Sequence, residues 1–341
     1  MRAIEYVEEI NNIKGKTIGI VYVFENNCSA PRNYDAWEGD VLSNWIHAVY
    51  ELHGLPLVMD VQTFVEKLSK GTLPPIDFVI NLSNGYFDIS SLGLVPSICT
   101  YYKIPCIPCN ASMLLAGENK RLSNLIAQSL GFHIPQLLDK QTPTSITRPN
   151  SLGSSYGVHR GAKASEPFDH FTQEFIPGLD VTIGILYNPI ENCLGIQPAV
   201  AYVPDSMDPQ WFFGEKEKQT HVGHSKRIVQ IDSHSKKQIE KLIKAFVITT
   251  YCRIDFRAKC NTTEEIQYSL TNGLSWDQLN FIEINLLPTI KAGNNFCFAL
   301  EHQEPDATMS TCYQLYQSNV RNATLTGFIL SCSILSIKAK H

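Results

Sequence analysis

Two hydrophobic periods alternate along the first third of the chain. Short runs of branched apolar residues, typical of buried strands, occupy residues 17–24, 55–61, 77–82 and 104–107. Apolar residues spaced three or four apart predict helices at 35–54, 62–70 and 92–102. Strands that alternate with helices usually pair in parallel, so the pattern predicts a parallel sheet flanked by helices.

The pattern changes after a helix predicted for residues 114–130. Residues 141–161 are rich in Thr, Ser, Pro and Gly, which marks the start of a second domain. The elements expected beyond it are strands at 171–176 and 181–186, a hairpin partner at 192–203, a polar loop at 204–222, a helix at 233–251, strands at 253–259 and 281–287, and helices after 306.

Composition and charge exclude several classes of function. The 341 residues are 44% hydrophobic and 18% charged, as in ordinary globular proteins. The net charge of −5 provides no basic field for nucleic acid. The start lacks a secretory pattern, and the late apolar stretch 327–337 is shorter than the ~20 residues of a membrane span. We expect a soluble, cytoplasmic protein that binds neither nucleic acid nor membrane.

The ten cysteines lack the dense, regular spacing of a disulfide scaffold, so reduced thiols are expected. One Cys-x-x-Cys motif occurs, at Cys106 and Cys109. No second pair completes a four-ligand zinc site, and small thiols in a hydrophobic core explain the motif more simply.

Two predicted strands carry polar side chains on one face. Alternate residues share a face in a strand, so Arg253, Asp255 and Arg257 point the same way, as do Glu283 and Asn285. If these strands pair, two carboxylates and an amide oxygen converge beside a guanidinium, which suits Mg²⁺. A solvent-facing row with one salt bridge would give the same spacing.

Three further stretches could bind a nucleotide. Arg148 precedes the Ser- and Gly-rich residues 153–157, whose backbone N–H groups and hydroxyls could surround a phosphate, although such loops are often simple turns. Lys120 lies near the start of a predicted helix, a position that favours anions but is also typical of surface lysines.

Residues 173–180 form the third stretch, which is extended and then turns sharply at Pro177 and Gly178. Phe175 and Ile176 could offer an apolar wall and backbone hydrogen bonds to a flat base, and Asp180 could reach a ribose hydroxyl. An ordinary strand end would explain the stretch equally well.

These signals occur in one order, and together they resemble the ATP-grasp superfamily, specifically D-alanine–D-alanine ligase-like enzymes, over about residues 16–295. The most specific matches are residues 153–157, 253–255 and 283–288. The resemblance implies an ATP-grasp fold of class α/β, with a parallel N-terminal α/β substrate domain (1–112), a short central lid domain (113–180) and a mixed-sheet catalytic domain (181–341).

The resemblance also implies a role for each matching position. ATP and Mg²⁺ would be the cofactors, with Mn²⁺ as an alternative metal. The metal ligands would be Asp255, Glu283 and Asn285. The catalytic residues would be Arg253, which steadies the intermediate, and Ser154 and Ser155 of the closing loop. The ATP-binding residues would be Lys120, Arg148, Gln173, Glu174, Phe175, Ile176 and Asp180, with Lys216 or Lys218 covering the phosphates.

The substrate positions depart from the D-alanine enzymes. Asn84 stands where they have a substrate-facing histidine, and Asn294 lies in the segment 289–295 that replaces their carboxylate-binding turn. Residues 135–148 and 158–173 are short for the family's lid. The resemblance therefore implies a ligase that phosphorylates an oxygen of a small acceptor and joins it to an amino acid.

Among ligases that resemble the D-alanine enzymes, those of mycosporine-like amino acid biosynthesis are similar in size to this chain. This resemblance implies mycosporine-glycine as acceptor and serine, threonine or another amino acid as amine. The alternatives are a dipeptide ligase of relaxed specificity and a non-catalytic nucleotide-binding module. Dimers are common among enzymes of this family, so a homodimer is a further expectation.

Overall fold

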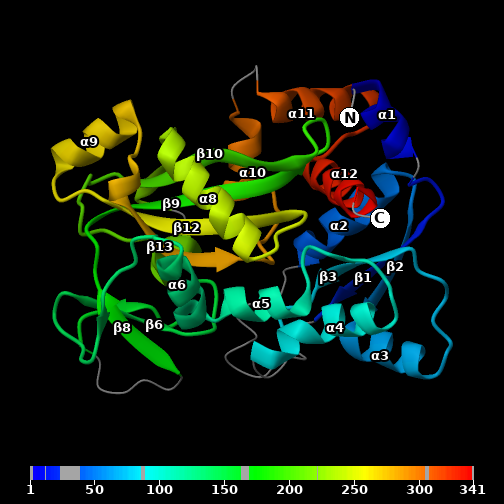
Figure 1. Ribbon diagram of the computed structural model, residues 1–341, viewed down its shortest axis with the longest axis horizontal. Coiled ribbons are helices and arrows are strands. Elements are labelled where there is room, and N and C mark those ends of the chain that lie inside the picture. Colours follow the sequence, from blue (N-terminus) through cyan, green and yellow to red (C-terminus); the bar gives the residue numbers. More distant parts are fainter. Residues whose placement is uncertain are drawn as a thin grey trace.

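The computed structural model describes residues 3–11, 13–23, 39–85, 89–162, 169–220, 222–303 and 307–339, which are arranged around three β-sheets (Figure 1). The capping position Asp35 and the adjoining Trp37, which we expected to begin the second predicted helix, lie outside these residues. Within the described part of the chain, no helix combines the length and the apolar character needed to cross a bilayer.

The first sheet is parallel, as the alternating pattern predicts. Its strand order is β2-β1-β3-β4, and its strands are β1 (Thr17–Tyr22), β2 (Leu55–Asp60), β3 (Phe78–Leu82) and β4 (Cys106–Ile107). The crossover helices are α2 (Gly39–Glu51), α3 (Val61–Ser69) and α4 (Leu94–Tyr101).

Successive side chains of the central strand β1 enter different cores. Ile18 and Ile20 pack with Trp45 of α2, whereas Val21 packs with Phe64 of α3. Because neighbouring side chains of a strand point to opposite faces, α2 covers one face of the sheet and α3 covers the other. Both faces are thus buried, which explains the nearly continuous apolar character of β1 and β3.

The second sheet has five antiparallel strands in the order β11-β10-β9-β12-β13. They are β9 (Gly178–Asn188), β10 (Cys193–Pro204), β11 (His224–Val229), β12 (Tyr251–Lys259) and β13 (Leu279–Asn285). The hairpin expected from residues 181–203 is formed by β9 and β10. A mixed sheet was expected in this part of the chain, but the five strands pair only antiparallel. Among the described residues outside the first sheet, parallel pairing occurs at the isolated bridges His133–Asn280 and Ile231–Leu274.

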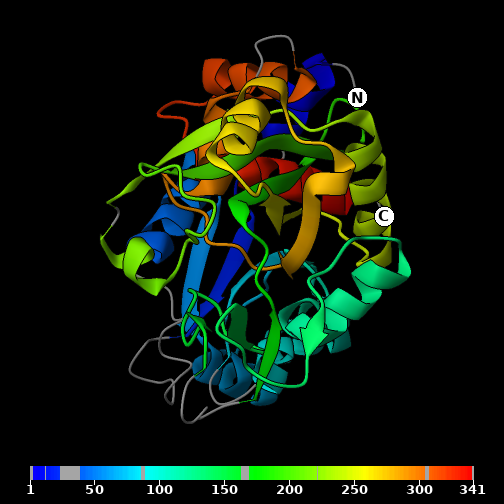
Figure 2. The same ribbon diagram turned by 90° about the vertical axis from the view of Figure 1, so that its left-hand side faces the viewer.

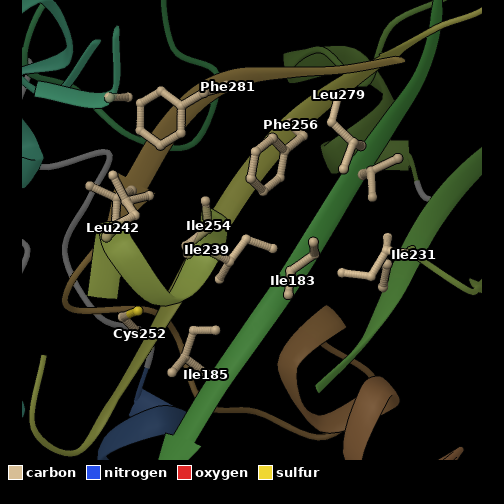
Figure 3. Packing of buried hydrophobic residues seen from close by; sticks show 14 of the residues in the cluster. Ile183, Ile185, Ile231, Ile239, Leu242, Cys252, Ile254, Phe256, Leu279 and Phe281 are labelled. Carbon is tan, nitrogen blue, oxygen red and sulfur yellow. The ribbon is translucent and has the colours of Figure 1, made fainter. Parts of the chain in front are cut away.

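The five-stranded sheet has one strongly apolar face. Ile183 of β9 and Ile254 of β12 pack against Ile239 and Leu242 of α8 (Ser233–Ala245), as Figure 3 shows. The polar residues of β12 and β13 alternate with these apolar residues, so they point to the opposite face. Helix α9 (Thr263–Asn272) occupies part of the insertion between β12 and β13.

The third sheet is small and antiparallel, in the order β5-β8-β6-β7 (lower left in Figure 1). Its strands are β5 (Leu137–Leu138), β6 (Ser145–Pro149), β7 (His159–Arg160) and β8 (His170–Glu174). Helices α5 (Ala111–Glu118) and α6 (Lys120–Ser129) precede it in the chain. The three-domain division stays a prediction, with these strands inside the expected lid.

The last helices return to the beginning of the chain. They are α10 (Asn295–Glu301), α11 (Thr308–Asn319) and α12 (Leu325–Lys338). Helix α11 lies beside α1 (Ala3–Asn11) in both views (Figures 1 and 2), and α12 packs against α2. The buried Glu51 of α2 accepts hydrogen bonds from the backbone N–H (2.9 Å) and hydroxyl (2.7 Å) of Thr324, which fixes the start of α12 to α2.

Some predicted elements differ from the structure. The single helix expected at 114–130 is two helices, because Asn119 has an extended backbone and its side chain accepts the N–H of Leu122 at 2.9 Å, capping α6. The helix expected at 233–251 ends at Ala245, since Val247 adopts a positive φ of 47°. Residues 141–161 contain the strand β6, and residues 204–222 contain helix α7 (Glu215–Thr220).

Candidate active site

A cavity of about 780 Å³ is lined by residues of the second and third sheets, and by Val41, Asn84 and Leu92 from the part of the chain that forms the first sheet. Among the described residues, seven side-chain cations face it: Lys120, Arg148, Lys218, Lys226, Arg253, Arg257 and Lys291. Five carboxylates line it: Glu118, Glu174, Asp180, Asp255 and Glu283. The excess of positive charge favours an anionic ligand.

The strands β12 and β13 bring the predicted metal-binding residues together. Asp255 is paired in register with Glu283, and Arg253 is paired with Asn285. Directly opposed residues of antiparallel strands have Cβ atoms ~5 Å apart, so the two carboxylates are neighbours on the cavity face. The pairing that the sequence analysis left conditional is confirmed. A bulge follows Asp255, so the register shifts between it and Phe256.

Asp255 is held from two sides. The guanidinium of Arg253 donates to both of its oxygens, with an Nη2–Oδ2 distance of 2.8 Å. The hydroxyl of Thr182 on β9 donates to Oδ1 at 2.7 Å, and the side chain of Asn295 donates to that hydroxyl at 3.1 Å. Burial lowers the pKa of Arg253, but the ion pair with Asp255 outweighs it and raises that pKa well above its ordinary value. The guanidinium of Arg253 is therefore charged at neutral pH.

Glu283 lies between two buried cations. Its Oε2 is 3.3 Å from Nζ of Lys120 and 3.9 Å from Nη1 of Arg148. Burial would raise the pKa of Glu283, but Lys120 and then Arg148 lower it, to about 2. Burial in turn lowers the pKa of Arg148 to about 10, and the guanidinium also donates to the backbone oxygen of Ile282 at 2.9 Å.

The break between α5 and α6 explains how Lys120 reaches this site. The Asn119 cap makes Lys120 the first residue of α6, and the backbone oxygen of Asn150 accepts the Lys120 N–H at 2.8 Å. Nζ of Lys120 also donates to the backbone oxygen of Leu152 at 2.7 Å. One lysine therefore connects Glu283 to the start of the Ser- and Gly-rich loop.

The Ser- and Gly-rich loop itself has an unusual backbone. Ser154 and Ser155 both have positive φ, of 55° and 57°, a conformation that non-glycine residues seldom adopt. Both residues line the cavity. The hydroxyl of Ser155 donates to the backbone oxygen of Phe213 at 3.3 Å, so the loop contacts the segment that precedes α7.

The predicted nucleotide hinge lines another part of the cavity, although its side chains already have protein partners. The side-chain amide of the buried Gln173 donates to the backbone oxygen of Pro135 at 3.2 Å, and Glu174 accepts the N–H of Gln136 at 3.0 Å. Phe175 packs edge-to-face on Phe212. These contacts attach the hinge to residues 135–136 and to Phe212.

Arg257 holds the end of the hinge in place. Its Nε donates to the backbone oxygen of Ile176 at 2.8 Å, and its Nη1 is 2.9 Å from Oδ2 of Asp180. The same Asp180 oxygen accepts the backbone N–H of Phe213 at 2.7 Å. The carboxylate expected to bind a ribose is thus already engaged by Arg257 and Phe213.

The remaining predicted residues differ in position. Lys218 lines the cavity, with Nζ 5.7 Å from the ring centre of Phe213, whereas Lys216 is exposed and does not line it. Asn84, just beyond β3, and Asn294 both line it. Among the described residues no group of three or more His, Cys, Asp or Glu side chains is arranged to hold a metal.

Several polar cavity residues were given no role by the sequence analysis, among them Arg257, Thr182, Asn295 and Lys226. For Arg257, strand alternation with Arg253 and Asp255 was the available signal. Thr182, Asn295 and Lys226 carry no local signal, since an isolated Thr, Asn or Lys is common on any surface. Only their contacts in the folded chain bring them into the site.

The donor set at β12 and β13 fits the Mg²⁺ that the resemblance implies. Asp255 and Glu283 supply carboxylates, and Asn285 supplies an amide oxygen that also accepts the N–H of Leu287 at 3.0 Å. Hard oxygen ligands of this kind suit Mg²⁺, which commonly takes one or two carboxylates and phosphate oxygens.

Comparison with solved structures identifies the fold. The D-alanyl-alanine synthetase A of Vibrio cholerae aligns with a TM-score of 0.63 at 15% identity, over 95% of this chain and 99% of its own. The D-alanine–D-alanine ligase of Bacillus anthracis in complex with ATP aligns with a TM-score of 0.62 at 13% identity, over 95% and 98%. The chain has the ATP-grasp fold of D-alanine–D-alanine ligases.

The similarity extends to a further ATP-grasp protein of this kind. The VanG D-Ala:D-Ser ligase of Enterococcus faecalis aligns with a TM-score of 0.57 at 16% identity, over 89% of this chain and all of its own. No protein-family model matches the sequence, and no curated protein matches it. At these identities the structural likeness establishes the ATP-grasp fold alone, so the activity has to be argued from the site.

Proposed function

We propose that the protein is an ATP-dependent carbon–nitrogen ligase. In the proposed reaction, an oxygen of a small acceptor attacks the γ-phosphorus of ATP, and ADP leaves. The amine of an amino acid then attacks the activated carbon, the carbon–oxygen bond to phosphate breaks, and the amine loses a proton to solvent. The products are the joined molecule, ADP and phosphate.

One observation carries the proposal: two carboxylates, two buried cations of the kind that bind phosphate and a paired guanidinium line one cavity. Asp255 and Glu283 are opposed in register, Lys120 and Arg148 contact Glu283, and Arg253 is hydrogen-bonded to Asp255. A purely structural ion-pair network would not require a cavity of about 780 Å³ beside it. The ATP-bound ligase of Bacillus anthracis, which shares the fold, supports ATP as the nucleotide.

The side chains of this site would work mainly by positioning and by charge. Asp255, Glu283 and Asn285 would hold Mg²⁺, which when bound neutralises negative charge on the phosphates. Lys120 and Arg148 would hold phosphate oxygens, and Ser154 and Ser155 would cover them. Because Thr182 and Arg253 fix the carboxylate of Asp255, the protein itself orients this ligand.

Lys218 is the lysine that we assign to the phosphates, because it lines the cavity and Lys216 does not. At the opposite part of the cavity, the backbone and rings of residues 173–176 would contact the adenine. The contacts of Asp180 with Arg257 and Phe213 support an indirect role, in which Asp180 shapes the ribose end of the pocket.

For the substrates, we propose mycosporine-glycine as acceptor and serine or threonine as amine. The changes that alter side-chain chemistry are on the substrate side, at Asn84 and Asn294, whereas the nucleotide side keeps a cation at both phosphate-binding positions, with Arg148 where a lysine is usual. The conjugated carbonyl of mycosporine-glycine can form an enol phosphate much as a carboxylate forms an acyl phosphate. Cytoplasmic location and homodimerisation remain predictions.

A dipeptide ligase of relaxed specificity is the second candidate. It is favoured by the solved structures of the same fold, which are D-Ala-D-Ala and D-Ala:D-Ser ligases. The two candidates differ in the acceptor alone, so the products distinguish them.

The experiment incubates the protein and MgATP with mixed amino acids, with and without mycosporine-glycine, and measures ADP, phosphate and product mass. Acceptor-dependent ADP release with an ultraviolet-absorbing product supports the first candidate. Release without the acceptor, with a dipeptide formed, supports the second. ATP binding with no ADP release under any of these conditions contradicts the ligase proposal and indicates a nucleotide-binding module.

A further inference from the structure

Lys226 enters the cavity from the strand at the edge of the five-stranded sheet. It lies on β11, where it is paired in register with Tyr202 of β10, and its ammonium is 5.7 Å from the ring centre of Tyr202. Nζ also donates to the backbone oxygen of Gly293, in the segment that follows Pro288. The side chain therefore spans from the sheet to the segment 289–295, where this chain departs from the D-alanine enzymes.

The charge of Lys226 has no counter-ion in the described part of the chain, unlike its neighbours. Lys291 is 2.7 Å from Oδ2 of Asp40, and Arg253 is 2.8 Å from Oδ2 of Asp255. Among the described residues, no carboxylate oxygen lies within 4.0 Å of the Lys226 ammonium. Burial lowers the pKa of Lys226, because it disfavours the charged ammonium. A bound anion would supply the missing negative charge.

Asn295, two residues beyond the Gly293 that Lys226 contacts, offers an unpaired acceptor in the same cavity. The hydroxyl of Thr182 donates to Asp255, so it must accept from Asn295, which assigns the Asn295 nitrogen to Thr182. The side-chain oxygen of Asn295 is then left buried, without a hydrogen-bond partner among the described residues. Asn295 is 4% exposed and lines the cavity, so a ligand N–H group would satisfy this oxygen.

Two of the three cations that we assign to the phosphates lie at the other edge of the sheet. The third, Lys218, is on the same side as Lys226, because its ammonium is 5.7 Å from the ring centre of Phe213, which stacks on Tyr202. Lys120 and Arg148 meet at Glu283 of β13, whereas Lys226 lies on β11, the opposite edge strand. With about 4.8 Å between adjacent strands, the two edge strands are about 19 Å apart. An anion held at Lys226 is therefore better matched by a substrate carboxylate than by the phosphates that Lys120 and Arg148 would hold.

We propose that Lys226 is a specificity-determining residue that binds the carboxylate of the amine substrate, while the side-chain oxygen of Asn295 accepts a hydrogen bond from its amine. This inference rests on the proposed ligase function and adds the substrate class: amino acids with a free carboxylate, and not simple amines or amino-acid amides. The cation and the unpaired acceptor together complement an amino acid.

The test compares amino acids with their C-terminal amides in ADP-release assays on the wild type, Lys226→Met, Lys226→Arg and Arg227→Met. Arg227 is the matched control, because it is exposed and is the next residue of the same strand, so it points to the other face. We expect Lys226→Met to reduce kcat/KM for the acid about tenfold to hundredfold, as for loss of a charged hydrogen bond, and to leave the amide unchanged. Lys226→Arg should retain part of the preference, and Arg227→Met all of it.

Two outcomes would overturn the assignment. If Lys226→Met leaves the ratio of kcat/KM for acid and amide unchanged, Lys226 does not contact the substrate carboxylate. An equal loss for acid and amide, with a raised KM for MgATP, assigns Lys226 to a phosphate instead.

A binding measurement separates this inference from the ligase proposal. Ligand-observed NMR would compare amino acids with their amides in the presence of a non-hydrolysable ATP analogue. Wild-type protein that binds acids in preference to amides but releases no ADP contradicts the ligase proposal and supports the role of Lys226. Wild-type protein that releases ADP equally with acids and amides supports a ligase and overturns the role of Lys226.

Discussion

Replacing Glu283 by Gln removes the carboxylate that two buried cations contact. Lys120 is 6% and Arg148 5% exposed, so neither charge can be well solvated after the change. Removing one partner of a buried ion pair typically costs about 3–5 kcal/mol. The pKa gives an independent figure, since a lowering from 4.5 to about 2 corresponds to about 3 kcal/mol of stability. We therefore expect Glu283→Gln to lose about 3 kcal/mol at pH 7.

The lowered pKa of Glu283 also determines how the stability of the protein should depend on pH. A carboxyl group whose pKa is lower in the folded protein contributes its full stabilisation above the unfolded value, here 4.5, and loses it as the pH falls towards 2. The wild type should therefore lose stability relative to Glu283→Gln between pH 4.5 and 2. The difference between the two proteins should be largest at neutral pH and shrink in that interval.

Urea unfolding followed by tryptophan fluorescence, in buffer without Mg²⁺ or nucleotide, measures this difference. Glu66→Gln is the control, because Glu66 forms an exposed pair with Lys70 at 3.5 Å. Such a pair contributes about 0.5 kcal/mol or less. The reasoning is refuted if Glu283→Gln destabilises no more than Glu66→Gln, or if its deficit is the same at pH 7 and below pH 4.

Three further predictions follow from the site. Asp255→Asn should abolish ADP release, because it removes a proposed metal ligand and the partner of Arg253; turnover at the wild-type rate would exclude the metal assignment. Lys218→Ala should raise the KM for MgATP several times more than Lys216→Ala, and steady-state kinetics giving the reverse order would contradict the cavity geometry. Asn119→Ala should cost about 1 kcal/mol in urea unfolding through loss of the α6 cap, and an unchanged midpoint would show that the cap contributes nothing.

Local patterns predicted most of the elements correctly. The alternation of β1, β2 and β3 with α2 and α3 gave a parallel sheet, and the apolar stripe of residues 233–245 gave α8. The errors came where one side chain decides the backbone. Nothing in the hydrophobic period of residues 114–130 shows a break, because the break depends on the hydrogen bond from the Leu122 N–H to the side chain of Asn119.

The sequence predicted part of the candidate site, as it predicted part of the fold. Strand alternation placed Asp255 with Arg253, and Glu283 with Asn285, but pairing between the two strands had to be assumed. The ion pair between Arg257 and Asp180 was not expected, because the two residues were considered separately. The unpaired acceptor of Asn295 could not be seen at all without the three-dimensional contacts.

The sequence by itself determined which residues share a strand face, since that depends only on the two-residue period of extended backbone. It therefore established two separate sets, Arg253 with Asp255 and Glu283 with Asn285, but not that the two sets meet. Only the tertiary structure decided what surrounds them: Thr182 reaches Asp255 across 73 residues, and Asn295 reaches Thr182 across 113. Contacts at such separations depend on how sheets and helices pack, and no local period of the chain encodes that packing.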